Sequence, residues 1–504
     1  MINISDAAKE LYKEDGIRKR TVIWFSENGV DSAGVDRVTT FEYTEGTPIL
    51  IEIGEGPDIS NSDNICIMDD EIEMNSLSIN ESIMDSGYEF VGCIASTCEV
   101  TIYGPRTANN FKKKMMDVFQ LLEGGEEIRL FRGYVDSAKT VLESTKKTIT
   151  AYDPIYKKTN DVDVADWYNN LTFPITMKDF RDSFFSRIGL AQESTTLIND
   201  DITIEKQYEP EKMQALDVLK SICQLNAVFG RCTRKGKFVY KSVTKTNVGG
   251  TSAYPGSMYP NQAYPSQGGS NRSRASSGTG NCWPANWYLF QGLQFEEFTV
   301  KAISKVAIRQ YTNDPEVTYG NGDNKYIIQG NMFTLNLQEE TKQLIAERVY
   351  NKVKSFKYVP FKVDTYGVPF LEPGDNIAFY VHDRRKGEDV VKGFTIMKRV
   401  FKGTQHLTDN FESDGDEDQK EFISDLNVSI NTIEKDLEDL YDDYEDLYDD
   451  FNDYVDNALN VEFVVQTPSV FTPNTLYFVR KGGTISSSGY INANVSGGET
   501  NSNG

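Results

Sequence analysis

Histidine, the side chain that most often transfers protons in catalysis, occurs only twice in this chain, as His382 and His406. Any catalytic pairing of serine or cysteine with histidine would have to use one of the two. His382 stands in the sequence HDRRKG, which we expect to be a hairpin loop, and His406 stands just before an acidic segment. The chain has no G-x-S-x-G, H-E-x-x-H or G-x-x-x-x-G-K-[ST] motif. We therefore predict no catalytic residues and no enzyme activity.

The acidic residues Asp161, Asp163 and Asp166 imitate the start of a calcium-binding loop. Asp166 occupies position 6, where such a loop needs glycine, and Thr172 occupies position 12, where it needs glutamate. The six cysteines include no C-x-x-C pair, so we expect free buried thiols and no zinc site. Nothing singles out a pair of carboxylates for glycoside hydrolysis among the 76 acidic residues. We predict that the protein binds no metal and no cofactor.

The strongest pattern in the sequence is a run of apolar residues spaced in sevens between residues 423 and 458. Unbroken spacing of this kind over five heptads is typical of a coiled coil. Position a holds Ile423, Ile430, Leu437, Tyr444, Phe451 and Ala458. Position d holds Leu426, Ile433, Leu440, Leu447 and Tyr454. Apart from Ala458, these residues form the predicted seam of an oligomer.

About half of the other positions of this segment are Asp or Glu and most of the rest are polar, so a helix here can bury only its seam, against partner helices. Isoleucine at both a and d in the first heptads favours three or four strands over two. The alternative is a single amphipathic helix lying on a domain, but such a helix usually has a wider apolar face. We therefore predict a homotrimer.

The acidity of the chain is concentrated around the same segment. The net charge is −24, and residues 412–456 contain 19 acidic and 2 basic side chains, a net of −17 that leaves −7 for the remainder. An acidic protein is a poor nucleic-acid binder, since counterion release needs lysine and arginine. We predict no specific binding of nucleic acid.

Short strands separated by turns dominate the rest, which predicts a mainly β protein with some α+β character. We expect a first barrel-like unit, a small α/β domain, a second barrel-like unit, the coiled coil and a short β segment. In the α/β domain Thr176 and Asp179 form a capping box, Gly189 ends that helix, and Lys235-Gly236 turns a hairpin. The expected divisions are 1–36 (a helix from residue 6 capped by Ser5, then a strand), 37–153, 154–245, 246–290, 291–410 (with a helix over 338–356), 411–460 and 461–504.

Within those units we expect specific strands and turns. The expected strands of the first unit include 49–54, 90–96, 98–104, 126–135 and 147–152. In the second unit, Gly320-Asn321-Gly322-Asp323 has the composition of a hairpin turn. A helix is expected to start at Pro210.

Residues 246–290 are rich in Gly, Ser, Asn, Pro and Tyr, with Tyr-Pro repeated at 254–255, 259–260 and 264–265. Such a composition cannot build a core, so we expect a long extended insertion, with binding of a sugar or a partner surface as the alternative. The N-terminal residues lack the apolar region of a signal peptide, and no apolar run is long enough to span a membrane. We expect a protein made in the cytoplasm, without a membrane span.

Long stretches of the chain resemble hub proteins of the tail tip or baseplate of phages and prophages of Gram-positive bacteria. The resemblance covers about residues 85–405 and includes LFRGYVDSAKTVLESTKKTITAYDPIYKK, DDITIEKQYEPEKMQALDVLKSICQLNAVFGRC and YIIQGNMFTLNLQEETKQLIAERVYNKV. It also includes the Tyr-Pro-rich insertion. Relatives in this family carry the hub as the N-terminal region of tail-associated lysins.

The resemblance implies a structural protein of the virion tail tip, assembled in the bacterial host cytoplasm. In the family, each protomer supplies two similar β-barrels, so a homotrimer makes a pseudo-sixfold ring around the DNA exit path. The implied partners are the distal tail ring, the tail tube, the tape-measure protein in the lumen, and fibre or tip proteins at the C-terminus. Longer relatives add a peptidoglycan-cleaving domain, which we do not carry over, because we expect only the coil and about 45 residues after the hub.

Two other functions stay open from the sequence. A tail fibre or receptor-binding protein would contact host glycan through the C-terminal strands or the Tyr-Pro insertion. A cell-wall hydrolase is disfavoured by the missing catalytic constellation.

Overall fold

The structure is a computed structural model of the 504-residue chain. It describes residues 1–2, 4–12, 19–33, 64–84, 92–122, 127–140, 145–206, 213–243, 245–248, 281–285, 292–383, 388–404, 406–417, 421–426, 460–464 and 475–479. The chain divides into two compact units, Met1–Ile430 and Asn431–Gly504, which are described separately.

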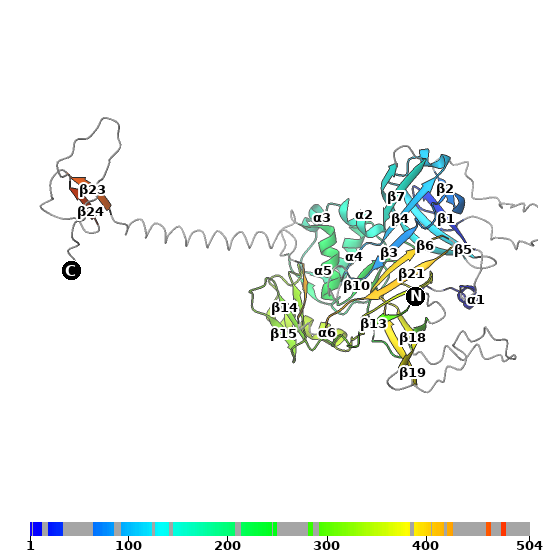
Figure 1. The fold of residues 1–504 in the computed structure, drawn as a ribbon. Coiled ribbons are helices and arrows are strands. Elements are labelled where there is room, and N and C mark those ends of the chain that lie inside the picture. The colour runs from blue at the N-terminus through cyan, green and yellow to red at the C-terminus, as the bar shows by residue number, and fades with distance from the viewer. Residues whose placement is uncertain are drawn as a thin grey trace, which may run out of the picture. The chain divides into compact units, whose positions relative to one another are not determined.

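An eleven-stranded sheet is the largest element in the described part of the first unit (Figure 1). Neighbouring strands in this sheet are antiparallel throughout. Their order is β13 (Gln294–Phe295), β17 (Phe361–Tyr366), β21 (Thr408–Ser413), β20 (Lys398–Lys402), β3 (Ser78–Ser82), β4 (Thr97–Tyr103), β7 (Lys146–Tyr152), β6 (Glu127–Thr140), β5 (Met115–Leu122), β1 (Lys19–Ser26) and β2 (Ile65–Met68).

The two expected β units are joined edge to edge within this sheet. β3 from the first unit pairs with β20 from the second over five residues, from Ser78↔Lys402 to Ser82↔Lys398. β1, expected in a separate N-terminal segment, pairs with β5 and β2. One apolar core lies beneath both units, because the same buried cluster contains Val100 of β4 and Phe411 of β21.

Smaller elements complete this region. Helix α1 (Asp6–Leu11) begins as predicted, with Ser5 Oγ accepting a hydrogen bond from the backbone N–H of Ala8 at 3.1 Å. The 3₁₀ turns η1 (Asp69–Glu71) and η2 (Pro105–Ala108) connect strands. A second sheet, of three strands, contains β12 (Trp283–Pro284), β18 (Asn376–Asp383) and β19 (Glu388–Thr395). The strand expected over residues 90–96 is wrong for its described part, where Cys93 makes only an isolated bridge to Gly230.

The α/β part agrees with the local sequence signals. Thr176 Oγ1 accepts a hydrogen bond from the N–H of Asp179 at 3.1 Å, and Gly189 ends the same helix with φ 63°. The predicted hairpin forms around Gly236. The elements are α2 (Pro154–Asn160), α3 (Ala165–Asn169), β8 (Ile175–Thr176), α4 (Met177–Ile188), β9 (Thr203–Ile204), α5 (Ala215–Leu225), β10 (Phe229–Cys232) and β11 (Phe238–Lys241). Residues 207–212, where the second helix was expected to start, lie outside the described residues.

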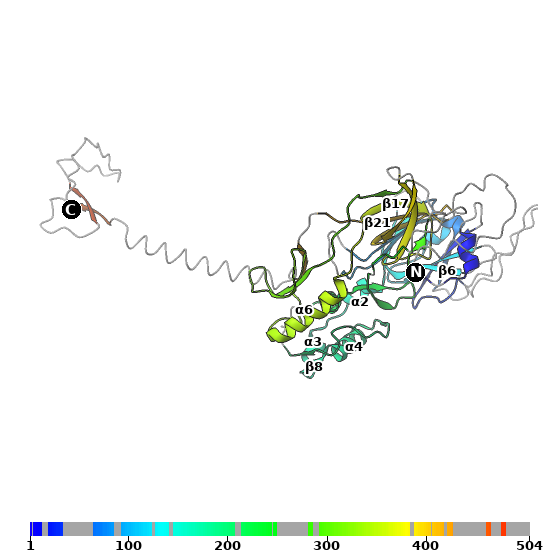
Figure 2. The same ribbon diagram turned by 90° about the horizontal axis from the view of Figure 1, so that it is seen from below.

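A four-stranded sheet packs against helix α6 (Glu339–Val353) in the same unit. Its order is β15 (Val317–Gly320), β14 (Lys305–Arg309), β16 (Lys325–Gln329) and β22 (Glu421–Asp425). The hairpin expected at residues 320–323 is wrong, because β15 and β16 lie on opposite sides of β14. The connection crosses the end of β14 so closely that a Cβ on Gly322 would lie 2.3 Å from Ser304 Oγ. In both views α3, α4 and α6 gather on one side and β6 on the other (Figures 1 and 2).

The start of the predicted coiled coil needs a correction. Ile423 lies in β22, which pairs in parallel with β16, and Leu426 directly follows that strand. The backbone N–H of Leu426 donates to Gln329 O at 3.1 Å, so the chain is still held to the sheet at that point. The remaining seam residues lie outside the described residues: Ile430, Ile433, Leu437, Leu440, Tyr444, Leu447, Phe451 and Tyr454. In the second unit, β23 (Asn460–Val464) and β24 (Thr475–Val479) pair in parallel.

A buried network of charges connects the parts of the first unit. Glu81 of β3 accepts hydrogen bonds from Arg399 of β20 at 2.7 Å, from Arg231 of β10 at 2.9 Å and from Arg234 of the hairpin turn at 3.2 Å. Arg399 also donates to both carboxylate oxygens of Asp409, at 2.8 and 3.1 Å. One carboxylate therefore ties the first β unit, the second β unit and the α/β hairpin together.

The surrounding loop and a second carboxylate complete the network. Arg231 lies 3.2 Å from Glu372, and the carbonyl groups of residues 368–373 accept from the arginines. Three arginines thus face three carboxylates, all of them buried. The balance of charges lowers the cost of burying this network, although Nε of Arg234 is buried without a hydrogen-bond partner.

Glu81 and Asp409 both accept hydrogen bonds from Arg399, but Glu81 also accepts them from Arg231 and Arg234. Burial alone would raise the pKa of Glu81, but Arg234, Arg231 and Arg399 outweigh it and hold that pKa at about 2. Burial raises the pKa of Asp409 to about 6, because the nearby Arg399 offsets it only in part. Glu81 is therefore the fixed charge of the network.

We expect Glu81→Gln to lower the free energy of unfolding of the first unit by about 3–5 kcal/mol at pH 7, since it leaves buried arginines without their shared counter-charge. The matched control is Glu99→Gln, whose side chain is exposed on the neighbouring β4 and should change stability by less than about 0.5 kcal/mol. Urea unfolding of both variants and of the wild type measures this.

Measuring the free energy of unfolding over a range of pH separates the loss of the Glu81 charge from any loss of packing that the substitution causes. The folded pKa of Glu81 lies below its ordinary value of 4.5, so its stabilising charge is present above about pH 4.5 and is lost as the pH falls toward 2. The stability gap between wild type and Glu81→Gln should therefore narrow over that range. Equal stabilities at pH 7, or a gap that stays constant with pH, would refute the role given to Glu81.

Candidate functional site

The residues considered for chemistry do not come together in the described part of the chain. His382 lies in strand β18, in register with Asp389, and not in the expected loop. His406 is exposed before β21. Asp163 accepts a hydrogen bond from the N–H of Ala165 at 2.8 Å and so serves the start of α3. Among the described residues, no group of three or more His, Cys, Asp and Glu side chains is placed to hold a metal ion.

The cysteines are packed as predicted, as free thiols. Five of the six are buried, and Cys66 is half-buried. Burial raises the pKa of Cys66 to about 12 and of Cys282 to about 11, and it also raises the pKa values of Cys93, Cys98 and Cys232. Thiols that stay protonated at neutral pH are poor nucleophiles, which fits a structural role.

The feature that extends furthest across the described molecule is the outward side of six neighbouring strands in the large sheet, which we call the polar face. Strand pairing without a bulge keeps these side chains on one side, from β17 through β21, β20, β3 and β4 to β7. The face consists of Lys362, Asp364, Tyr366, Thr408, Asn410, Glu412, Lys398, Val400, Lys402, Ser78, Asn80, Ser82, Thr97, Glu99, Thr101, Thr148, Thr150 and Tyr152. The pair Tyr103 and Lys146 extends the same side at the end of β4 and β7, where the charge of Lys146 is balanced by its ion pair with Glu73.

The opposite side of the same strands is buried. Phe411, Arg399, Glu81 and Val100 alternate with residues of the polar face along their strands. This alternation is the rule for an antiparallel sheet that covers a core with one side only. Hence the buried charge network and the polar face are two sides of one sheet.

Short polar side chains bond to one another across the strands of the polar face. Asn410 Nδ2 donates to Asp364 at 2.7 Å, and Thr101 and Thr148 share a hydrogen bond at 3.0 Å. Asn80 donates to Thr97 at 3.3 Å. Cross-strand pairs of this kind stabilise a sheet and consume donors that a ligand could otherwise use.

The polar face carries no net charge. Its 18 residues include three lysines, at 362, 398 and 402, and three acids, at 99, 364 and 412. Glu412 lies 3.7 Å from both Lys362 and Lys398. A surface with paired charges and many hydroxyl groups stays hydrated, and it has no continuous row of basic side chains that would bind the phosphates of nucleic acid.

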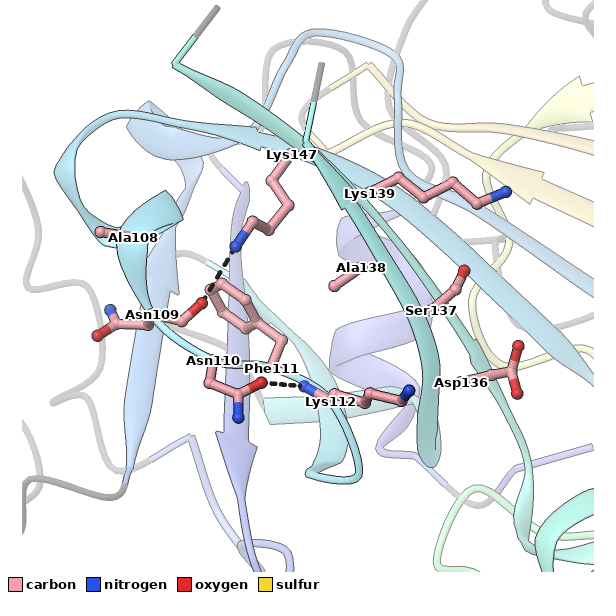
Figure 3. Close-up of a pocket in the computed structure, with 10 residues that line it drawn as sticks. All are labelled: Ala108, Asn109, Asn110, Phe111, Lys112, Asp136, Ser137, Ala138, Lys139 and Lys147. Atoms are coloured by element: carbon pink, nitrogen blue, oxygen red, sulfur yellow. Dashed lines mark hydrogen bonds between the residues drawn. The ribbon is translucent and has the colours of Figure 1, made fainter. Parts of the chain in front are cut away.

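A cavity of about 490 Å³ opens beside this face, at the end of the β6–β7 hairpin (Figure 3). Lys147 donates to Asn109 O at 3.1 Å and lies over the Phe111 ring, so it is already occupied. Lys112 and Lys139 are exposed, and Asp136 faces the same space. The lining does not converge on one point, which a specific small-molecule site would need.

Sequence reasoning missed the polar face because it lies on strands that are far apart in the chain. β3 and β20 are separated by more than 300 residues, and three residue pairs join their rows: Ser78↔Lys402, Asn80↔Val400 and Ser82↔Lys398. The available signal was the run of Ser, Thr and Asn at alternate positions in several strands. These residues form a continuous surface only in the folded sheet, so the surface could be recognised only once the strand order was known.

No protein family model and no curated protein sequence matches the chain. Its fold is similar to solved tail proteins. The 43 kDa tail protein of prophage MuSo2 from Shewanella oneidensis is 12% identical, with a TM-score of 0.40, over 68% of this chain and 94% of that one. Prophage tail protein gp18 from Listeria monocytogenes is 12% identical, with a TM-score of 0.39, over 69% and 91%. A tail protein from Neisseria meningitidis is 12% identical, with a TM-score of 0.37, over 69% and 95%.

We expect the purified chain to release no soluble fragments from purified peptidoglycan. This expectation rests on the sequence, which has only two histidines and no H-E-x-x-H motif and singles out no pair of carboxylates for glycoside hydrolysis. Fragment release is measured by the reducing ends and amines that appear in the supernatant, with lysozyme as the positive control. Release above that of heat-denatured protein would contradict the expectation.

Proposed function

We propose that this protein is a structural hub of a phage or phage-like tail tip, forming a homotrimer whose ring continues the tail tube. The observation that carries the proposal is the joining of two antiparallel β units in one sheet, side by side through β3 and β20. Two such units in each of three copies would offer six neighbouring positions to a sixfold tube. The sequence resemblance to tail-tip hubs supports the same arrangement.

The trimer itself rests on the heptad pattern. Five unbroken heptads with isoleucine at early a and d positions follow the packed unit. Because β22 contains Ile423, the proposed helix would begin after this strand, with Ile430 as its first seam residue. Four full heptads remain after it, enough for a stable bundle of acidic helices.

The polar face supports a place for the exit path. DNA moving through a channel must not be held by the wall, and a basic wall would hold phosphate through counterion release. The polar face is continuous over both β units, hydrogen-bonded within itself and neutral. It therefore suits the side of the ring that faces the lumen, where the tape-measure protein and then DNA would pass.

The other proposed partners follow from this position. The distal tail ring and the tail tube would contact one end of the ring, and fibre or tip proteins would contact the C-terminal segment. Among the described residues no helix is long and apolar enough to cross a membrane. We place the protein in the virion tail tip.

A fibre or receptor-binding role is the second candidate. The paired strands β23 and β24 follow the predicted coil, which is the position of a small terminal domain. Host glycan would then be bound by that segment, in addition to the hub role of the first unit.

We expect the double variant Ile430→Asp and Ile433→Asp to dissociate on dilution, because it puts charge into the predicted seam, where an unpaired buried charge is costly. Asn431→Asp with Thr432→Asp is the matched control, since it adds the same charge at neighbouring positions outside the seam. Sedimentation velocity over a range of concentrations measures the trimer fraction. A wild type that is a stable monomer at micromolar concentration would refute the trimer, and equal behaviour of the two variants would refute the seam.

We expect lysines on the polar face to slow genome release. The variant is Asn80→Lys, Thr101→Lys and Thr150→Lys, which gives the face a charge of +3 in each copy and should add a salt-dependent hold on DNA. The rate of DNA release from particles carrying the variant is measured at low and high salt.

The control for this variant adds the same charge elsewhere. Asn170→Lys, Ser194→Lys and Thr196→Lys lie at exposed positions of the α/β part, away from the polar face. Release should be slowed only by the face variant, and high salt should restore it. If both variants release DNA at the wild-type rate, or both are slowed alike, the polar face does not line the exit path.

A further inference from the structure

Strand β22 is held firmly on its inward side. Phe422 is 1% exposed in the core, and Ser424 is 3% exposed. Gln224 of α5 donates to the carbonyl of Ser424 at 2.5 Å and to its hydroxyl at 3.0 Å. Asn331 in turn donates to Gln224 Oε1 at 2.7 Å. The last described strand before the predicted coil is therefore locked to a helix of the body by a buried polar cluster.

The other side of β22 continues an apolar row across the four-stranded sheet. In register, Ala307 of β14 lies beside Ile327 of β16, and Ile327 lies beside Ile423 of β22. Ala307 and Ile327 are fully buried, whereas Ile423 is 43% exposed. Ile423, the last residue of this row, is therefore the one that is exposed at the surface.

Most of the described charges around this row are paired within the chain. Lys325 lies 3.0 Å from Glu316 and 3.1 Å from Glu421, and Arg309 donates to Gln329 at 2.6 Å. Lys325, Glu421, Arg309 and Gln329 lie at the ends of the apolar row, and Glu316 directly precedes β15. A neighbouring molecule that covered Ile423 would therefore meet an apolar side chain rimmed mainly by paired charges, which lowers the cost of covering it.

The length of chain after β22 bears on which molecule covers Ile423. Leu426 and Ile430 are four residue steps apart, and a fully extended chain of that length spans at most about 14 Å. Helices in contact lie about 8–10 Å apart, so a seam residue of the proposed trimer is within roughly 6 Å of the bundle axis. Leu426 would then lie within about 20 Å of that axis in every copy. In the proposed trimer, a second copy of the same strand therefore lies across the axis from β22.

We infer that Ile423 is an additional subunit contact, in which the exposed isoleucines of neighbouring copies pack around the axis just before the coiled coil begins. The inference rests on the proposed trimer and deepens it. The heptad pattern placed Ile423 in the coiled coil. Here Ile423 instead belongs to an interface between the folded first units of neighbouring copies. The partner is another copy of this chain, recognised by an apolar side chain on a rigid strand.

A single exposed isoleucine is common on protein surfaces, so the test needs a matched comparison. Leu344 on α6 is 40% exposed, nearly the same as Ile423, and belongs to the same unit. Ile423→Asp and Leu344→Asp therefore make the same kind of change at the two sites. Both variants keep the whole predicted coil.

The trimer dissociation of the full chain is followed by sedimentation or light scattering on dilution. We expect Ile423→Asp to raise the concentration at half dissociation at least about tenfold, which for a trimer is a hundredfold change in the dissociation constant, or about 2.8 kcal/mol per trimer. Leu344→Asp should leave it within about twofold. Circular dichroism melting of both variants checks that the body remains folded.

A cross-linking arm covers the case in which Ile423→Asp perturbs the strand. Ile423→Cys and Leu344→Cys each add one exposed thiol to a chain whose own cysteines are buried or half-buried. Mild oxidation should link neighbouring copies through residue 423 and not through residue 344. A trimeric wild type with no effect at residue 423 in either arm overturns this inference and leaves the trimer standing, whereas a monomeric wild type overturns both.

Discussion

The architecture depends on a single carboxylate, that of Glu81. The two β units meet along only five paired residues of β3 and β20, and a pairing so short is weakly specified by backbone hydrogen bonds alone. Glu81 and Arg399 are neighbours across that pairing, on its buried side. A slip of β3 by one residue would turn Glu81 outward and take the shared carboxylate away from Arg231, Arg234 and Arg399. The network therefore specifies how the two units are aligned and how the α/β hairpin sits against them.

Local chemistry predicted the local elements. The capping pair Thr176 and Asp179, the helix end at Gly189 and the turn at Gly236 all have the conformations that their residue types favour. The predictions that failed concern residues and strands that interact although they lie far apart in the sequence. β3 has the sequence SINES, which reads as a polar loop, because its inward Glu81 is balanced by arginines up to 318 residues away. The hairpin predicted at residues 320–323 is wrong because β14, the strand that separates its two arms, lies earlier in the chain.

Ile423 shows how two periodicities can compete. Spacing of seven placed Ile423 and Leu426 in a helix, whereas alternation by two places Phe422 and Ser424 inward from a strand. A buried serine is a poor strand signal until Gln224 is known to bond to it. Of the candidate site, composition supports the expectation that the chain has no catalytic constellation, but it could not predict the polar face, which exists only in the order of the strands. The distribution of charge therefore differs between the interior and the surface. The buried charges are balanced, the polar face of the sheet is neutral, and most of the net negative charge lies in residues 412–456.

The parallel pairing of β22 with β16 has a mechanical consequence. Five residue pairs, from Lys325↔Glu421 to Gln329↔Asp425, lie side by side along both strands. A pull on the chain beyond Leu426 that is directed along the strand would stress these hydrogen bonds together in shear, instead of opening them one at a time like a zipper. The bonds from Gln224 to Ser424 would resist the same displacement. Tension arriving from the C-terminal side, as when a particle is tethered to a surface, would then pass into α5 and the body before it could peel the strand away.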